Sequence, residues 1–192
     1  MGKIVVSENA TLDGVISDPT GDAGSGSGGW FARTSAEDLA VWGRHEQAEA
    51  EHAEALLLGG GTYRYFEQRW ATREGEWADR LRTICKYVVS STLVDPAWGS
   101  THVLTGEVPS EVRALKEQVD GEIVVYGSGR LVHTLWEHGL VDELRLIVYP
   151  FLAGGGQRIL PPRGTATPLE LVETGRIGSS LTTAVYRSSA AA

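Results

Sequence analysis

Two glycine clusters stand where an apolar, strand-like run gives way to apolar residues at helical spacing. Gly59, Gly60 and Gly61 lie in LLLGGGTYRYF, and Gly127 and Gly129 flank a serine in IVVYGSGRLVHTL. At such a junction the first N–H groups of the helix have no partner within the helix, and the helix dipole adds partial positive charge. Because glycine has no side chain, a phosphate can approach this backbone closely. These residue types at this spacing therefore predict phosphate binding.

A pair of such junctions on one sheet predicts a ligand with two linked phosphates. Ligands of open α/β sheets bind at the carboxyl ends of the strands, where we expect both junctions to lie. The alternative is that the glycines only permit tight turns from strand to helix. Neither cluster completes a nucleotide-binding motif, since Val132 replaces the third glycine of G-x-G-x-x-G and GGGTYRYF lacks the Gly-Lys-Ser/Thr of a P-loop. We therefore disfavour a Rossmann dehydrogenase and a P-loop NTPase.

The elements that must position these residues follow from apolar periodicity. Strands are expected at Lys3–Ser7, Ala55–Gly60, Cys85–Ser91, Thr101–Gly106, Glu122–Gly127 and Asp142–Leu152, with a terminal hairpin in Leu169–Ser188. Helices are expected at Ser35–Glu54, Gly60–Trp70, Pro109–Asp120 and Ser128–Gly139. This order predicts one α/β domain over residues 1–187, with helices on both faces of a mixed sheet. The sheet is mostly parallel with an antiparallel C-terminal hairpin, and residues 188–192 form a frayed tail.

The segment Asp18–Trp30 is a Gly/Ser-rich loop that is too long for a simple connector. It could be a mobile lid over a site or a disordered surface loop.

Composition excludes several classes of protein. The chain has 192 residues, 42% of them hydrophobic, and a formal charge of -8, so a nucleic-acid-binding surface is disfavoured. Its N-terminal stretch lacks the apolar core of a signal peptide and the length of a membrane span, which predicts a cytoplasmic protein. Cys85 is the single cysteine, and His45 and His52 have no third ligand at suitable spacing, so we expect no metal site.

Several stretches together resemble the dihydrofolate-reductase-like superfamily. They are NATLDGVIS, LLLGGGTYRYF, KYVVSSTL and GEIVVYGSGRLVHTLWEHGLVDELRLIVYPFLAGGGQRIL, followed by the closing hairpin. Within this superfamily the chain is most similar to the C-terminal reductase domain of bifunctional riboflavin-biosynthesis deaminase-reductases. The resemblance covers nearly the whole chain, and VDELRLIVYPFLAGGGQRIL is its most specific part.

The resemblance implies that the glycine junctions bind NADPH. Gly59, Thr62 and Tyr63 match the turn that holds the pyrophosphate, although Gly60 and Gly61 stand where that turn is usually basic. The other matches are Ser90 and Ser91 beside the adenosine 2′-phosphate, and Gly127, Ser128 and Gly129 beside the pyrophosphate and nicotinamide.

Two further residues match the substrate side of the family's site. Asp13 lies in the Leu-Asp-Gly motif that borders the nicotinamide and substrate, and it is the candidate proton donor. Trp30 matches an aromatic residue at the end of the mobile loop. Glu37 and Asp38 are alternative donors, but we expect them on a solvated helix face. The other five tryptophans are expected in the core or at a dimer contact: Trp42, Trp70, Trp77, Trp98 and Trp136.

The implied reaction is hydride transfer from NADPH to a carbon–nitrogen double bond or carbonyl of a small heterocycle. A pterin- or folate-like compound and an aminopyrimidine-ribosyl compound are the candidate substrates. The resemblance also implies a homodimer. The alternative functions are a flavin- or nucleotide-binding module without turnover and a structural or regulatory dimer with a vestigial pocket, because fold analogy alone does not establish catalysis.

Overall fold

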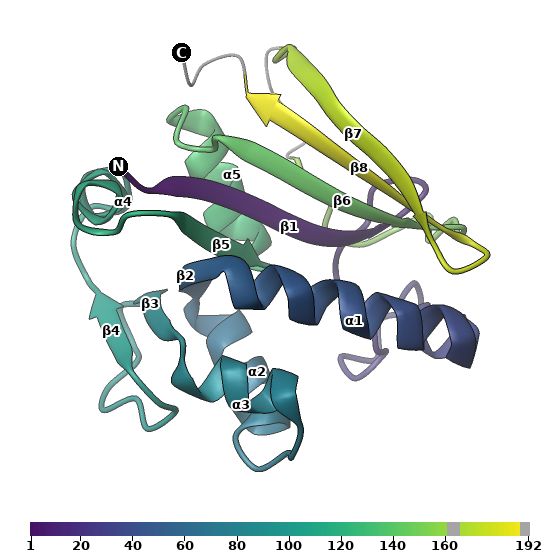
Figure 1. The fold of residues 1–192 in the computed structure, drawn as a ribbon, viewed down its shortest axis with the longest axis horizontal. Coiled ribbons are helices and arrows are strands. Elements are labelled where there is room, and N and C mark those ends of the chain that lie inside the picture. Colours follow the sequence, from purple (N-terminus) through teal and green to yellow (C-terminus); the bar gives the residue numbers. More distant parts are fainter. Residues whose placement is uncertain (161–165, 189–192) are drawn as a thin grey trace.

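The computed structural model describes residues 1–160 and 166–188. Its sheet contains eight strands in the order β4-β3-β2-β5-β1-β6-β8-β7 (Figure 1). Their bounds are β1 Lys3–Thr11, β2 Ala53–Gly59, β3 Cys85–Val89, β4 Thr101–Leu104, β5 Glu122–Tyr126, β6 Glu143–Tyr149, β7 Leu169–Ile177 and β8 Leu181–Ser188. All pairings from β4 to β6 are parallel, whereas β8 pairs antiparallel with both β6 and β7. The predicted mixed sheet with an antiparallel C-terminal hairpin is confirmed.

Helices cover both faces of this sheet, as predicted. They are α1 Ala36–His52, α2 Gly60–Trp70, α3 Glu76–Thr83, α4 Val108–Gln118 and α5 Gly129–Glu137, with a short 3-10 turn η1 at Phe31–Arg33. Leu115 of α4 and Leu135 of α5 pack in one buried cluster, while Tyr63 of α2 and Leu81 of α3 pack in another. The central strands between these layers are apolar on both sides, as in buried parallel sheets. Residues 189–192 of the expected tail lie outside the described residues, and Ser188 is the last residue of β8.

Helix α3 has no counterpart among the predicted elements. It has eight residues, of which only Ala78 and Leu81 are buried. Two buried positions are too few to make a helical period visible in the sequence.

The start of α1 is tied to the terminal hairpin. Ser35 caps the helix, because its Oγ accepts a hydrogen bond from the Asp38 backbone at 3.1 Å. The Asp38 carboxylate accepts from the Ser179 N–H at 2.6 Å and from the Ser180 hydroxyl, both in the turn between β7 and β8. Asp38 is buried, so the expectation that it lies on a solvated helix face is wrong.

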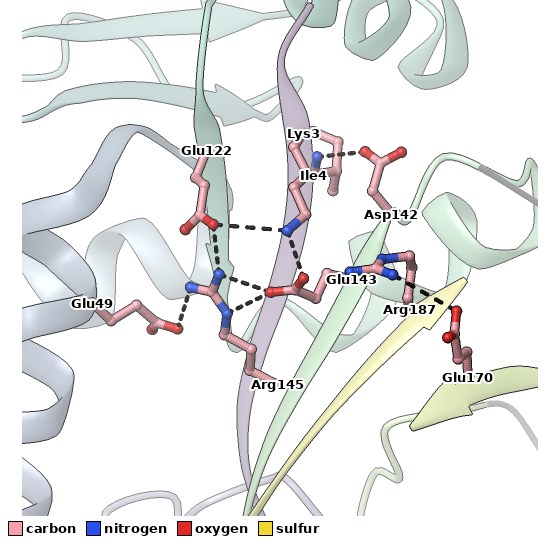
Figure 2. A network of polar contacts seen from close by, with 9 residues as sticks. All are labelled: Lys3, Ile4, Glu49, Glu122, Asp142, Glu143, Arg145, Glu170 and Arg187. Atoms are coloured by element: carbon pink, nitrogen blue, oxygen red, sulfur yellow. Dashed lines mark hydrogen bonds and ion pairs between the residues drawn. The ribbon is translucent and has the colours of Figure 1, made fainter. Parts of the chain in front are cut away.

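An ion network joins the amino ends of β1, β5 and β6 to α1 (Figure 2). The Arg145 guanidinium contacts Glu49 at 3.1 Å, Glu122 at 2.6 Å and Glu143 at 2.8 Å, and Lys3 also pairs with Glu143. Burial opposes the ionisation of Glu143, but Lys3 and Arg145 outweigh it and lower the pKa of that carboxyl. Carboxylates at this end of the sheet therefore have basic partners.

Among the described residues, no helix is long and apolar enough to cross a membrane. In that part of the chain, no three His, Cys, Asp or Glu side chains are grouped so that they could hold a metal ion.

Candidate functional site

A cleft of about 910 Å³ opens at the carboxyl ends of β1, β2 and β5. Its floor and walls include Ser7–Asn9 of β1, Gly59–Thr62 at the start of α2, and Tyr126–Leu131 at the start of α5. This is the edge at which open α/β sheets bind ligands. Both glycine junctions therefore face the same cleft.

The two junctions are hydrogen-bonded to each other through Ser128. Its Oγ accepts from the Gly59 N–H at 2.9 Å, and its own N–H donates to Thr62 Oγ1 at 2.9 Å. Left-handed backbone conformations occur at Gly127 (φ +54°) and Ser128 (φ +58°), and not at Gly129. The turn thus needs conformational freedom at Gly127, whereas Gly129 is needed for another reason.

The space around the glycines shows which of them keep the cleft open. A Cβ at Gly61 would meet no described atom within 4 Å, so the start of α2 faces open space. A Cβ at Gly129 would lie 2.6 Å from Gln157 Nε2 and 3.0 Å from Ile16 Cδ1. Gln157 and Ile16 both line the cleft. A side chain at Gly129 would consequently push its neighbours into the cleft.

Ser90 and Ser91, which are predicted to bind the 2′-phosphate, lie beside α2 and are not among the residues that line the cleft. Ser90 Oγ is oriented toward Gly60, where an added Cβ would approach it to 2.8 Å, and Ser91 is exposed. Arg64, one turn into α2, donates to Thr92 Oγ1 at 3.0 Å. Arg64 therefore supplies the basic group that Gly60 and Gly61 do not provide at this turn. The sequence could have indicated this, because Arg64 follows Gly60 by four residues and so lies on the same face of the helix.

Tyr63 lies in the core. It is fully buried, and its hydroxyl accepts a hydrogen bond from the Trp98 backbone at 3.1 Å. It does not line the cleft, so it supports α2 from behind.

Asp13 holds together two chain segments next to the cleft. Its carboxylate accepts hydrogen bonds from the Thr11 hydroxyl at 2.7 Å, the Ala153 N–H at 3.0 Å and the Gly154 N–H at 2.9 Å. These hydrogen bonds lower the pKa of Asp13, and the bond from Thr11 has the largest effect. Asp13 is not among the residues that line the cleft. Its contacts fit a positioning role better than proton donation.

Trp30 is buried beside the cleft. Its ring centroid lies 4.7 Å from that of Tyr149 and 5.6 Å from that of Phe31. Phe31 reaches the cleft, whereas Trp30 does not. Trp30 therefore anchors the end of the Gly/Ser-rich loop.

An aromatic wall forms one side of the cleft. It consists of Phe31, Trp42, Tyr65, Phe66, Trp70 and Trp77. Trp77 packs against Trp70 at 4.5 Å and against Trp42 at 5.6 Å between ring centroids. Trp42, Trp70 and Trp77 pack against buried clusters of the core, as expected, and all three also line the cleft. Such a wall suits a planar ring.

The Gly/Ser-rich loop lies along the cleft and is fastened to α2. Asp22 forms an ion pair with Arg69, and the hydroxyls of Thr20 and Tyr65 lie 3.2 Å apart. Within the loop, the Asp18 carboxylate accepts from two backbone N–H groups. These contacts favour the lid interpretation over a loose surface loop.

Two acidic residues in the cleft escaped the sequence analysis. Glu8 of β1 and Glu46 of α1 are 4% and 3% exposed, and both line the cleft. The sequence does mark Glu8 as unusual, because this glutamate directly follows the strand-like run KIVVS. A charged residue in such a strand is uncommon unless it is paired or functional.

The family model described as the RibD C-terminal domain matches residues 2–183 of this chain. The structure of a diaminohydroxyphosphoribosylaminopyrimidine deaminase/5-amino-6-(5-phosphoribosylamino)uracil reductase of Thermotoga maritima is 16% identical, with a TM-score of 0.65; the match covers 97% of this chain and 56% of that one. Dihydrofolate reductase of Enterococcus faecalis, solved with NADP(H), is 14% identical with a TM-score of 0.61, covering 97% and 96%.

A curated relative is YyaP of Bacillus subtilis, 30% identical over 83 residues, which are 43% of this chain and 44% of YyaP. The matched part thus spans less than half the length of that relative. The likeness to the two solved structures shows that the chain has the dihydrofolate-reductase-like fold. Because the family model spans almost the entire chain, the chain belongs to the family of RibD C-terminal domains.

Proposed function

We propose that this protein is an NADPH-dependent reductase that transfers a hydride to a small heterocycle of the pterin or folate type or the aminopyrimidine-ribosyl type. The observation that carries the proposal is the pair of helix starts joined through Ser128 and facing one cleft. Membership in the RibD C-terminal domain family supports reductase chemistry. The cleft volume lies within the range of ligand sites, roughly 300–1,000 Å³.

The residues at the cleft fit the proposed cofactor. The open space at Gly61 gives a phosphate access to the N–H groups at the start of α2. The N–H groups at the start of α5 are close by, because Ser128 links the two helix starts by a hydrogen bond to Thr62. Arg64 and Ser90 would hold the 2′-phosphate. Bound reduced nicotinamide would supply the hydride. The aromatic wall would orient a planar ring and exclude water.

Cofactor binding tests the proposal directly. NADPH at about 100 times its dissociation constant should stabilise the protein by about 2.7 kcal/mol, which appears as a higher melting temperature. Arg64→Gln should weaken NADPH binding about five- to tenfold and leave NADH binding unchanged, because NADH has no 2′-phosphate. Fluorescence titration with both nucleotides measures this difference. The absence of any melting shift with millimolar NADPH or NADH would rule the proposal out.

The substrate can be sought by NADPH oxidation with dihydrofolate, aminopyrimidine-ribosyl compounds and flavins. The aromatic wall would also accept a flavin ring. A yellow protein that binds flavin and oxidises no NADPH would favour the binding-module alternative. A cytoplasmic location remains part of the proposal.

We also propose a homodimer formed through the terminal hairpin. Strand β7 ends the sheet order and exposes Leu171 and Val172 by 55% and 46% (Figure 1). Exposed apolar edges tend to be covered by pairing. Light scattering at micromolar concentration should give twice the chain mass, and Leu171→Lys should shift the protein toward monomer. A monomeric wild-type protein would contradict the dimer.

A further inference from the structure

Glu8 lines the cleft and has an unsatisfied carboxyl oxygen. Its Oε1 is buried and has no hydrogen-bond partner among the described residues. A buried carboxyl oxygen without a partner is costly unless a ligand completes it.

Glu8 and Glu46 have no basic partner, in contrast to the buried carboxylates Glu49 and Glu143. No Lys, Arg or His of the described chain forms an ion pair with either of them. By contrast, Arg145 contacts three carboxylates at the amino end of the sheet (Figure 2). Burying two neighbouring carboxylates without a cation strongly disfavours a charge on both.

Burial in the cleft wall favours the neutral acid at Glu8, and burial followed by the charge of Glu49 also raises the pKa of Glu46. Burial, and then the charge of Glu46, raise the pKa of Glu8 well above its ordinary value, against a smaller opposing effect of the Gly127 hydrogen bond. A protonated Oε1 is a hydrogen-bond donor on a residue that lines the cleft.

The other candidate donors are less suitable. Hydrogen bonds lower the pKa of Asp13 and of Asp38, so both stay ionised at neutral pH. Burial, followed by the charges of Glu49 and Glu46, raises the pKa of Tyr126 well above its ordinary value. No histidine lines the cleft among the described residues.

We propose that Glu8 is the catalytic acid of the reduction and donates its carboxyl proton to the nitrogen that adjoins the reduced carbon. The inference rests on the proposed reductase function. The acceptor's carbon gains the hydride from reduced nicotinamide, the electron pair of its C=N bond moves to nitrogen, and that nitrogen takes the Glu8 proton. Glu8 is left as a carboxylate and regains a proton from water.

The charges around Glu8 set the direction of the pH dependence. Glu46 faces it from α1, and the other charged groups of the cleft are Asp18 and Asp22 of the loop and the arginines Arg69, Arg73 and Arg130. Asp22 already pairs with Arg69. Reduction should therefore fall as pH rises through the raised pKa of Glu8, and Glu46→Gln should move this fall to lower pH by removing a negative charge.

The protonation state can be measured without cofactor or substrate. The infrared difference spectrum of wild type minus Glu8→Gln at neutral pH should show the C=O stretch of a protonated carboxyl. Glu117→Gln, on an exposed position of α4, is the matched control and should show a carboxylate band instead. A carboxylate band for Glu8 as well would overturn the proposal. If Glu8→Gln does not fold, the pH titration of ¹³C-labelled glutamates in the wild type gives the same reading.

Turnover separates the acid role from the proposed function. With the fastest acceptor from the NADPH-oxidation screen, Glu8→Gln should bind NADPH as the wild type does but react at least about 100-fold more slowly, as expected for loss of a general acid. Glu8→Asp should recover part of the rate. An unchanged rate in Glu8→Gln would overturn the role of Glu8 alone. A wild-type protein that does not bind NADPH would reject the reductase, while the infrared result would still report on the Glu8 proton.

Discussion

Replacing Gly129 by valine should weaken NADPH binding by at least about tenfold, or about 1.4 kcal/mol, while the protein stays folded. An added Cβ would lie 2.6 Å from Gln157 Nε2 and 3.0 Å from Ile16 Cδ1, so the new side chain displaces cleft-lining groups at the start of α5. Since Gly129 does not adopt a positive φ, valine adds no left-handed strain there. Chemical denaturation should show a cost of about 1–3 kcal/mol, typical of overpacking.

Gly139→Ala is the matched control for this prediction. Gly139 does not line the cleft, has φ +61°, and an added Cβ there would meet no described atom within 4 Å, so alanine should cost about 1–2 kcal/mol of stability without touching the cleft. We expect this variant to be destabilised with near wild-type NADPH affinity. If Gly129→Val also loses stability but keeps its affinity, then the glycines shape the turn and do not mark the cofactor site.

Replacing Gly178 by alanine should destabilise the protein by about 2–5 kcal/mol, the sum of left-handed strain and overpacking. Gly178 has φ +58°, and an added Cβ would overlap the Asp38 carboxylate and reach 3.1 Å from the Asp38 Cα. This change therefore tests whether the hairpin turn is fastened to the start of α1. Thermal and denaturant unfolding measure the loss.

Gly139→Ala isolates the strain, because Gly139 has φ +61° and an added Cβ there meets no described atom within 4 Å. It should cost only about 1–2 kcal/mol. In an Asp38→Ala background the loss of stability caused by Gly178→Ala should be smaller, because the overlap with the Asp38 carboxylate is gone. Equal costs for the two glycines would contradict the proposed junction.

The same junction predicts sensitivity to acid. Hydrogen bonds from Ser180 and Ser179 lower the pKa of Asp38 to about 2. Because the folded pKa lies below the unfolded value of about 3.9, the contribution of Asp38 is present above that value and is lost as pH falls toward 2. Asp38→Ala should remove this part of the pH dependence.

The sequence by itself determined the order of strands and helices, the two glycine junctions and the family. Apolar strands and helical periods are local patterns, and a phosphate-binding turn is a short contiguous segment. Eleven consecutive residues were enough to place the Gly59–Thr62 turn between β2 and α2. The eight-residue α3 escaped because its two buried residues make no visible period.

Tertiary structure alone decided what each side chain does. Asp13, Asp38 and Glu8 are all acidic residues, yet the first two accept N–H groups from segments about 140 residues away and stay ionised. Glu8 is instead buried and lies near the charge of Glu46, and both effects favour its neutral form. A pKa depends on the solvent, dipoles and charges that the fold brings together, and those come from chain segments far apart in the sequence. For that reason the sequence nominated Asp13 but not Glu8, and only the fold places Glu8 in a buried position beside Glu46.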